Sequence, residues 1–157
     1  MRLRNIPRAE GMIRLHRAVI QRPEAQKGSW RQVFGNKNPI YIEIGMGKGQ
    51  FILEMARQHP EVNFVGIERY SSVLLRAIEK FDTEEFQSLE NIRFICMDAR
   101  NVEDVFAPQE VETVSYTHLS GLSRLSIHCS LSASGWQESA WNRQGSYLVP
   151  RNNARNA

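Results

Sequence analysis

The feature that most constrains the fold of this chain is a strand-like run that ends in three closely spaced glycines. The stretch from Tyr41 to Phe51 reads YIEIGMGKGQF. Isoleucines alternate with other residues over 40–44, as in a strand, and apolar residues then recur at helical spacing over 51–56. Glycine lets a backbone turn sharply and lets a ligand approach it closely. The stretch therefore predicts a strand, a glycine loop and a helix, an order typical of nucleotide-binding α/β proteins.

The same alternation of elements continues along the chain. Residues 63–68 and 92–97 have the composition of buried strands, and residues 111–115 are predicted to begin a fourth strand. Between the second and third strands, apolar residues at helical spacing over 74–81 predict a helix that Ser71 or Ser72 would cap. Strand–helix–strand–helix–strand is the first half of a doubly wound sheet, so the predicted fold class is α/β and Rossmann-like.

The residues before the first strand form a separate segment, 1–39. Residues 1–9 are predicted to be an extended arm, followed by an amphipathic helix whose apolar positions run from Met12 to Ile20. Trp30 and Phe34 belong to one apolar turn, which Gly35 would end. We divide the remainder into a partial α/β domain, 40–115, and a tail, 116–157, in which no clear periodicity predicts regular structure.

Composition supports this division. Residues 1–112 hold 16 Lys and Arg against 16 Asp and Glu, so the four Arg and one Glu of residues 113–157 supply the whole net charge of +3. Serine occurs four times in the first 112 residues and nine times in the last 45. We therefore interpret the tail as unlike the rest of the chain, with the character of an irregular or non-native segment.

The bulk composition also bears on compartment and on some classes of ligand. A hydrophobic content of 41% with 24% charged residues is typical of a globular protein. No apolar run approaches the ~20 residues of a membrane helix, and the N-terminus has no apolar signal region. Cys96 and Cys129 lie too far apart for a zinc motif and form no disulfide framework, and Cys96 is predicted to lie in the core. A cytoplasmic protein without a metal site is expected.

The glycine spacing narrows the choice of cofactor. Gly45, Gly47 and Gly49 give G-x-G-x-G, which is neither the dinucleotide fingerprint nor a phosphate-binding P-loop. Glu43, two residues before the first glycine, would repel the phosphates of a nucleotide but would suit a cationic ligand. S-adenosylmethionine carries an ammonium and a sulfonium group and no phosphate, so it fits this position.

Acidic residues end the next two predicted strands as well. Glu68 is placed to accept hydrogen bonds from ribose hydroxyls, and Asp98 to accept one from an adenine amino group. Parallel strands place their carboxyl ends at one edge, so we expect the three acids to converge there. The predicted cofactor-binding residues are Glu43, Gly45, Gly47, Glu68 and Asp98. The alternatives are an ordinary turn with solvated acids and an NAD-binding oxidoreductase, for which Glu68 would contact the ribose.

Several stretches resemble the bacterial tRNA (guanine-N7-)-methyltransferases over about residues 1–112. They are MRLRNIP, the run from GSWRQVFGNKNP through YIEIGMGKGQF to VNFVGIE, SSVLLRAIEK and ICMDA. The resemblance implies an S-adenosylmethionine-dependent fold and methyl transfer to N7 of guanine 46 in tRNA. It also implies that the five residues above contact the cofactor and that the basic arm with Arg2, Arg4 and Arg8 lies near the tRNA.

The chain departs from that family after the third predicted strand. The family continues into an N-F-S-D-P-W-P motif whose aspartate is tied to catalysis, whereas this chain reads EVETVSYTHLSGL. We therefore predict a truncated form that lacks the catalytic half, and no catalytic residue is named. Two other functions stay open from the residues alone: a fragment of an NAD-binding oxidoreductase, and a non-catalytic RNA-binding module.

Overall fold

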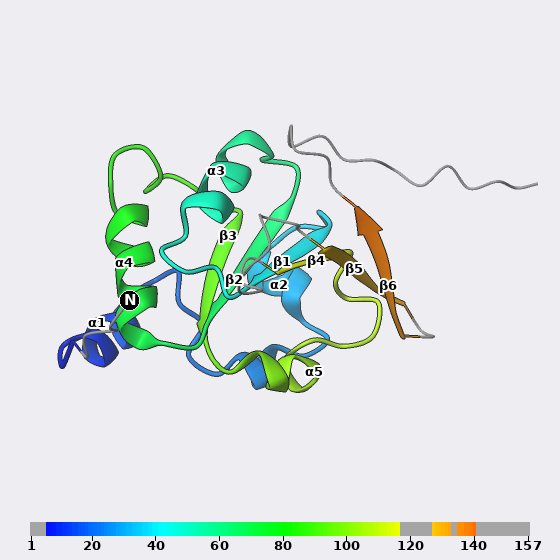
Figure 1. The fold of residues 1–157 in the computed structure, drawn as a ribbon. Helices are drawn as coiled ribbons and strands as arrows, with labels where there is room; N and C mark the ends of the chain where they lie inside the picture. The colour runs from blue at the N-terminus through cyan, green and yellow to red at the C-terminus, as the bar shows by residue number, and fades with distance from the viewer. Residues whose placement is uncertain (1–5, 117–126, 133–134, 141–157) are drawn as a thin grey trace, which may run out of the picture.

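The chain forms one mixed β-sheet with helices on both faces. The computed structural model describes residues 6–116, 127–132 and 135–140. The strands are β1 (Ile40–Ile44), β2 (Asn63–Glu68), β3 (Ile92–Cys96), β4 (Thr113–Tyr116), β5 (Ile127–Ser132) and β6 (Gly135–Ala140). Their order in the sheet is β3-β2-β1-β4-β5-β6, with β3 at one edge and β6 at the other (Figure 1). The first four strands are parallel, which confirms the predicted α/β fold class.

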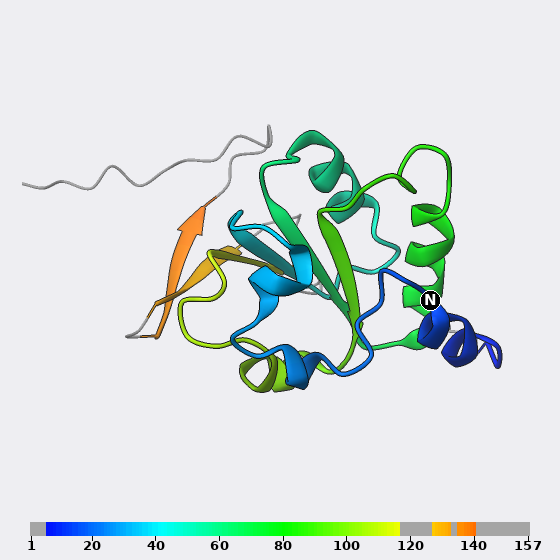
Figure 2. The ribbon, with the colours of Figure 1, turned by 180° about the vertical axis from the view of Figure 1, so that it is seen from behind.

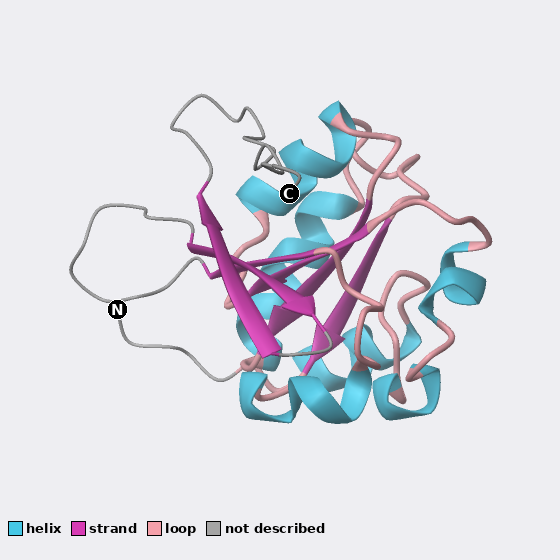
Figure 3. Cartoon of the chain, turned by 90° about the vertical axis from the view of Figure 1, so that its right-hand side faces the viewer, coloured by secondary structure: helices cyan, strands magenta, loops and turns pink. Residues whose placement is uncertain are grey.

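Helices cover the sheet in two layers. The described helices are α1 (Ala9–Leu15), η1 (Pro23–Gln26), α2 (Trp30–Phe34), α3 (Gln50–Gln58), α4 (Ser71–Phe81), η2 (Ala99–Asn101) and α5 (Val102–Val105). Buried residues of α1, α3 and α4 belong to one hydrophobic cluster, and those of α2 and α5 belong to the other. Figures 2 and 3 give the reverse and side views, in which helices flank the strands. The parallel strands are therefore buried on both faces, as in other α/β folds.

Each cluster is built around aromatic side chains. On the face of α1, α3 and α4, the fully buried Phe81 and Phe94 meet edge to face with 5.8 Å between ring centroids. On the opposite face, the buried Trp30 stacks on Phe106 at 4.9 Å, and its indole Nε1 donates to the carbonyl of Val105 at 2.9 Å. The indole is thus buried with its one polar group satisfied.

The segment before α2 differs from the prediction. The predicted helix through Ile20 is wrong beyond Leu15, where α1 ends. The next residues run along the outer side of β3: Phe94 N donates to Ala18 O at 2.8 Å, and Ile20 N donates to Phe94 O at 2.9 Å. These bonds satisfy backbone groups that an open edge strand would expose. Hydrogen bonding to β3 therefore determines the backbone conformation of this segment, although its apolar residues have helical spacing.

Three smaller predictions also need correction. The N-cap of α4 is Tyr70, without a side-chain capping bond, so neither Ser71 nor Ser72 caps that helix. Phe51, expected on the inner stripe of α3, lies in the first turn of that helix and is 41% exposed. Cys96, expected in the core, is exposed at the last position of β3.

The structure also contains strands that the sequence did not predict. In the region assigned to an irregular tail, β5 and β6 pair as an antiparallel hairpin, and β5 pairs with β4. Residues 117–126, 133–134 and 141–157 lie outside the described residues, as do residues 1–5 with Arg2 and Arg4. No helix in the described ranges is long and apolar enough to cross a bilayer.

Candidate functional site

The glycine loop after β1 adopts a backbone that favours glycine at three positions. Gly45, Gly47 and Gly49 have φ values of 69°, 60° and 75°, all in the left-handed region. Gly49 also allows a close approach between helices, because a Cβ there would lie 2.9 Å from Cβ of Ala77 in α4. The predicted loop is therefore confirmed as a sharp connection from β1 into α3.

The loop is anchored on the neighbouring strand, β2. The amides of Gly45 and Met46 both donate to the carbonyl of Ile67, at 2.9 and 3.2 Å. Met46 is 4% exposed and lies over Gly66, where an added Cβ would stand 2.3 Å from its Sδ. Because Gly66 has no side chain, the Met46 side chain can lie over it and anchor the loop.

Glu68, the last residue of β2, joins the loop to the next connection. Its Oε2 accepts from the Gly47 amide at 3.1 Å, and its Oε1 accepts from the Tyr70 amide at 3.1 Å. The residue is 7% exposed. A carboxylate has about four lone-pair positions, so each oxygen keeps the capacity to accept one further hydrogen bond.

Asp98 lies two residues beyond the end of β3, on the connection next to Glu68. The Met97 amide donates to the Glu68 carbonyl at 3.1 Å, which ties the two connections together. The Asp98 carboxylate accepts from the Arg100 amide at 3.0 Å and from its guanidinium at 3.1 and 2.9 Å. Arg69 Nε lies 3.6 Å from Asp98 Oδ2. The hydrogen bonds from Arg100 hold the pKa of the Asp98 carboxyl well below its usual range.

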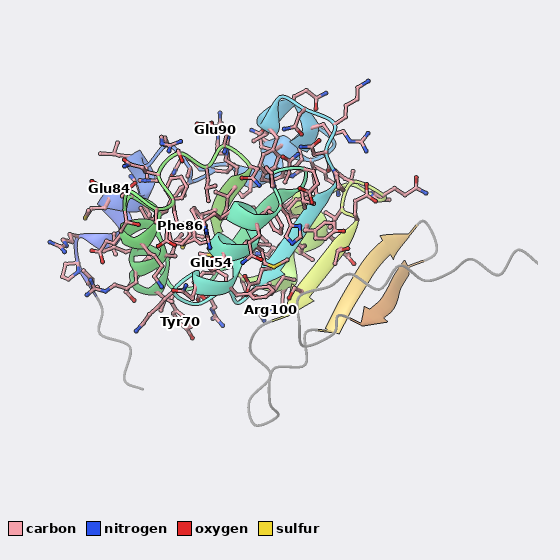
Figure 4. The ribbon with its side chains drawn as sticks, turned by 90° about the horizontal axis from the view of Figure 1, so that it is seen from above. Glu54, Tyr70, Glu84, Phe86, Glu90 and Arg100 are labelled. Carbon is pink, nitrogen blue, oxygen red and sulfur yellow. The ribbon has the colours of Figure 1, made fainter. Side chains whose placement is uncertain are left out.

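The two connections lie along one edge of the molecule. In Figure 4, Tyr70 from the connection after β2 and Arg100 from the connection after β3 lie along the same edge. Tyr70 is 48% exposed, and Arg69 stacks on its ring with 5.7 Å between the guanidinium carbon and the centroid. An aromatic ring and two guanidinium groups therefore surround the two acidic strand ends.

Glu43 lies inside the sheet, beneath α3. It is 2% exposed and lines a cavity of about 20 Å³ together with Phe51, Met55 and Ser115. This volume suffices for about one water molecule. In the described part of the chain, the Ser115 hydroxyl is buried without a hydrogen-bond partner. Neither Glu68 nor Asp98 lines this cavity.

The structure thus brings some of the predicted site residues together more closely than others. Gly45, Gly47 and Glu68 are joined by hydrogen bonds within the loop and β2, and Asp98 is linked to them through the adjacent connection. Glu43 opens into a separate small cavity. The convergence of all three carboxylates on one ligand stays a prediction. Among the described residues, no group of three or more His, Cys, Asp or Glu side chains could hold a metal ion.

Sequence reasoning missed the residues that position these acids. The contact between Met46 and Gly66 could be suspected from the sequence only because Gly66 lies inside a predicted strand. A glycine at such a position often marks the close approach of another group. Arg69 directly follows Glu68 and Arg100 lies two residues after Asp98, yet these positions alone did not predict that both would pair with Asp98.

Comparison with known proteins supports a single family. A family model described as a putative methyltransferase matches residues 37–118. The tRNA (guanine-N(7)-)-methyltransferase of Lachnoclostridium phytofermentans is 54% identical over 114 residues, which cover 73% of this chain and 52% of that protein. The enzyme of the same name from Bacillus subtilis is 44% identical over 115 residues, covering 73% and 53%. The chain spans about half the length of these curated relatives.

One solved structure supports the fold. An antibiotic-related methyltransferase superposes with a TM-score of 0.50 at 18% identity, covering 60% of this chain and 47% of that one. The family model spans the glycine loop, Glu68 and Asp98, and the relatives match nearly three quarters of the chain at high identity. The chain therefore belongs to the putative methyltransferase family that this model describes, and over nearly three quarters of its length it is similar to bacterial tRNA (guanine-N7-)-methyltransferases.

Proposed function

We propose that this chain binds S-adenosylmethionine at the ends of β1, β2 and β3 and serves methyl transfer to N7 of guanine 46 in tRNA. The observation that carries the proposal is the Glu68 carboxylate, which is fixed by the amides of Gly47 and Tyr70 at the end of β2. The relatives named tRNA (guanine-N(7)-)-methyltransferase support the choice of reaction.

The residues at the adenosine end of the proposed site suit this cofactor. Glu68 retains lone pairs that would accept the two ribose hydroxyls, and the loop at Gly45 and Gly47 would let the ligand approach the backbone. Asp98 would accept from the adenine amino group after the Arg100 side chain moves aside. That side chain is 82% exposed, so its displacement costs little packing.

The amino-acid end of the cofactor would lie toward Glu43. The buried carboxylate there would favour an ammonium or sulfonium group over a phosphate. The cavity beside Glu43 has room for about one water molecule, so the methionine chain would lie above it, at the loop, unless α3 shifts. When bound, the cofactor supplies an electrophilic methyl group attached to a sulfonium.

The proposed chemistry asks the protein mainly to align the reactants. Guanine N7 carries a lone pair and no proton, so a bond to the methyl carbon forms as the carbon–sulfur bond breaks and its electron pair passes to sulfur. No proton leaves N7, so no base is required before attack. Alignment of nitrogen, carbon and sulfur is the contribution expected of the protein. Because tRNA is a cytoplasmic substrate, the reaction belongs to the cytoplasm.

A chimera tests this function. Residues 6–112 of this chain would replace the matching part of the Lachnoclostridium phytofermentans relative, to which the chain is 54% identical. We expect the chimera to transfer labelled methyl groups to unmodified tRNA at guanine 46, and to lose that activity in tRNA with adenine at this position. A folded chimera that binds tRNA but transfers no methyl group, or methylates both tRNAs equally, would contradict the proposal.

A further inference from the structure

A second depression lies next to the proposed cofactor site, between α1 and the start of α4. Its volume is about 280 Å³, against roughly 10–15 Å³ for one water on the same measure. The side chains that matter come from α1, from the connection between β2 and α4, and from the end of β3: they are Glu10, Arg14, Arg69, Ser71 and Cys96. Figures 1 and 2 both place α1 beside α4.

Three contacts join this depression to the proposed cofactor site at Glu68 and Asp98. Arg69 directly follows Glu68 and lies 3.6 Å from Asp98. The Cys96 thiol lies 3.7 Å from the Arg69 carbonyl, and Cys96 is the register partner of Glu68 across the sheet. Although Cys96 is exposed as a residue, partial desolvation of its thiol raises the thiol pKa, and the nearby carboxylates of Glu68 and Glu10 raise it further. A ligand in the depression would therefore lie beside a ligand held by Glu68.

The three arginines in and beside α1 fall into two groups. Arg8 lies 3.7 Å from Glu79 and Arg17 lies 3.9 Å from Glu90, so both hold this segment against α4 and the loop after it. The Arg14 side chain forms neither an ion pair nor a hydrogen bond within residues 6–116, and it lines the depression. Its guanidinium is therefore open to a ligand, whereas the charges of Arg8 and Arg17 are already balanced.

The lining has the chemistry of a phosphate subsite. Two guanidinium groups line the depression with one carboxylate, from Glu10: that of Arg14, and that of Arg69, which shares its charge with Asp98 at 3.6 Å. The Ser71 hydroxyl is a further donor. The amide donors of Gln21 are already used by the carbonyls of Ile13 and Val19, so Gln21 adds no donor. Guanidinium groups match phosphate oxygens in geometry and stay charged at all physiological pH values.

Acidic side chains elsewhere on the molecule favour the same edge for RNA. In Figure 4, Glu84 and Glu90 lie away from the edge that carries Tyr70 and Arg100. An approaching RNA backbone would be repelled from the side that carries Glu84 and Glu90 and attracted to the edge with Arg14, Arg69 and Arg100.

We propose that this depression binds a phosphodiester group of the tRNA backbone between Arg14 and Arg69, and so positions the RNA against the methyl-donor site. The inference rests on the proposed function, which it extends by naming a contact point for the RNA. Contacts to phosphates set register and orientation on a nucleic acid without reading its sequence. Arg14 is accordingly a positioning residue.

Three single substitutions in the full chain test the subsite. Arg14→Gln should weaken binding of unmodified tRNA about tenfold, or about 1.4 kcal/mol, and lower the salt-dependence slope by about 1. Glu10→Gln should strengthen binding, because it removes the one carboxylate of the depression. Arg31→Gln is the matched control, since Arg31 is an exposed arginine on α2, in the opposite helix layer. It should change the slope by much less than Arg14→Gln.

A second measurement locates the RNA without relying on affinity. In a Cys129→Ser chain, bound tRNA should slow alkylation of Cys96, and poly-L-glutamate should not. Equal losses for Arg14→Gln and Arg31→Gln, unprotected Cys96 under saturating tRNA, or equal protection by poly-L-glutamate would each overturn the subsite. Binding of S-adenosylhomocysteine, measured on the same samples, separates this failure from failure of the proposed function.

Discussion

At the scale of single residues, the site depends on side chains that accept hydrogen bonds from backbone amides. Glu68 fixes two connections at once, through the amides of Gly47 and Tyr70. The acid was predicted from its place at a strand end. Its hydrogen bonds to the Gly47 and Tyr70 amides were not predicted, because they join residues that no sequence pattern links.

Removal of the Glu68 side chain should loosen the site. Glu68→Ala leaves the Gly47 and Tyr70 amides without their acceptor, so the free energy of unfolding should fall by about 1–3 kcal/mol. Glu68→Gln keeps one carbonyl oxygen, so its free energy of unfolding should lie between those of Glu68→Ala and wild type. Urea denaturation measures both. Glu84→Gln serves as control, because Glu84 is exposed and has no hydrogen bond or ion pair in the described ranges. Loss of the same size in the control would contradict this role.

Gly66 should tolerate no larger residue while Met46 stays in place. Gly66→Ala puts a methyl group 2.3 Å from the Met46 Sδ, so the anchor of the loop must move, at a cost of about 1–3 kcal/mol. Gly11→Ala is the control: a Cβ there meets nothing within 4 Å, and alanine favours a helix. In the double variant Met46→Ala, Gly66→Ala, thermal melts should reveal a cost smaller than the sum of the two single changes. Additive costs would contradict the contact.

Asp98 should make stability depend on pH in the acid range. Hydrogen bonds from Arg100 lower the pKa of this carboxyl in the folded state below its ordinary value of 3.8. The resulting stabilisation is present above that value and is lost as the pH falls toward the lower folded value. In unfolding experiments from pH 7 to pH 2, the stability gap between wild type and Asp98→Asn should be constant above about pH 5 and shrink below about pH 4. A gap that does not change across this range would refute the pairing.

At the scale of elements, the sequence predicted those parts whose apolar spacing matches their burial. β1, α3, β2, α4 and β3 follow the periodicity of the chain, because parallel strands and the helices that cover them are buried in regular stripes. The end of α1 could not be predicted this way. Residues 18–20 continue a helical spacing, but their backbone satisfies the open edge of β3, a contact between residues far apart in the chain.

A second contact between residues far apart in the chain joins the N-terminal segment to the loop between α5 and β4. The Glu110 carboxylate accepts from the amides of Gly28, Trp30 and Ala107, each at 2.9 Å, and so joins the start of α2 to the loop before β4. Glu110→Ala should lower the free energy of unfolding by about 1–3 kcal/mol, because the partly buried amides of Trp30 and Ala107 lose their acceptor. Glu112→Gln, a nearby exposed acid, is the control for charge. Hydrogen exchange should speed up at Trp30 in the Glu110 variant alone. Unchanged exchange there would contradict the assignment.

At the scale of the whole molecule, the parallel order of β3, β2, β1 and β4 confirms the arrangement expected from the sequence. That order places the ends of β2 and β3 at one edge, which made Glu68 and Asp98 predictable as neighbours. Three features depended on tertiary contacts and were beyond the sequence: the pairing of Asp98 with Arg69 and Arg100, the separate cavity at Glu43, and the hairpin of β5 and β6.

The central claim is that the loop closed by Glu68 holds S-adenosylmethionine. Isothermal titration with S-adenosylhomocysteine tests it most directly. We predict one binding site per chain for wild type and for Glu84→Gln, at least a tenfold loss of affinity for Glu68→Ala, and no binding of NADH at the same concentrations. NADH binding as tight as that of S-adenosylhomocysteine, or unchanged affinity in a folded Glu68→Ala chain, would contradict the account.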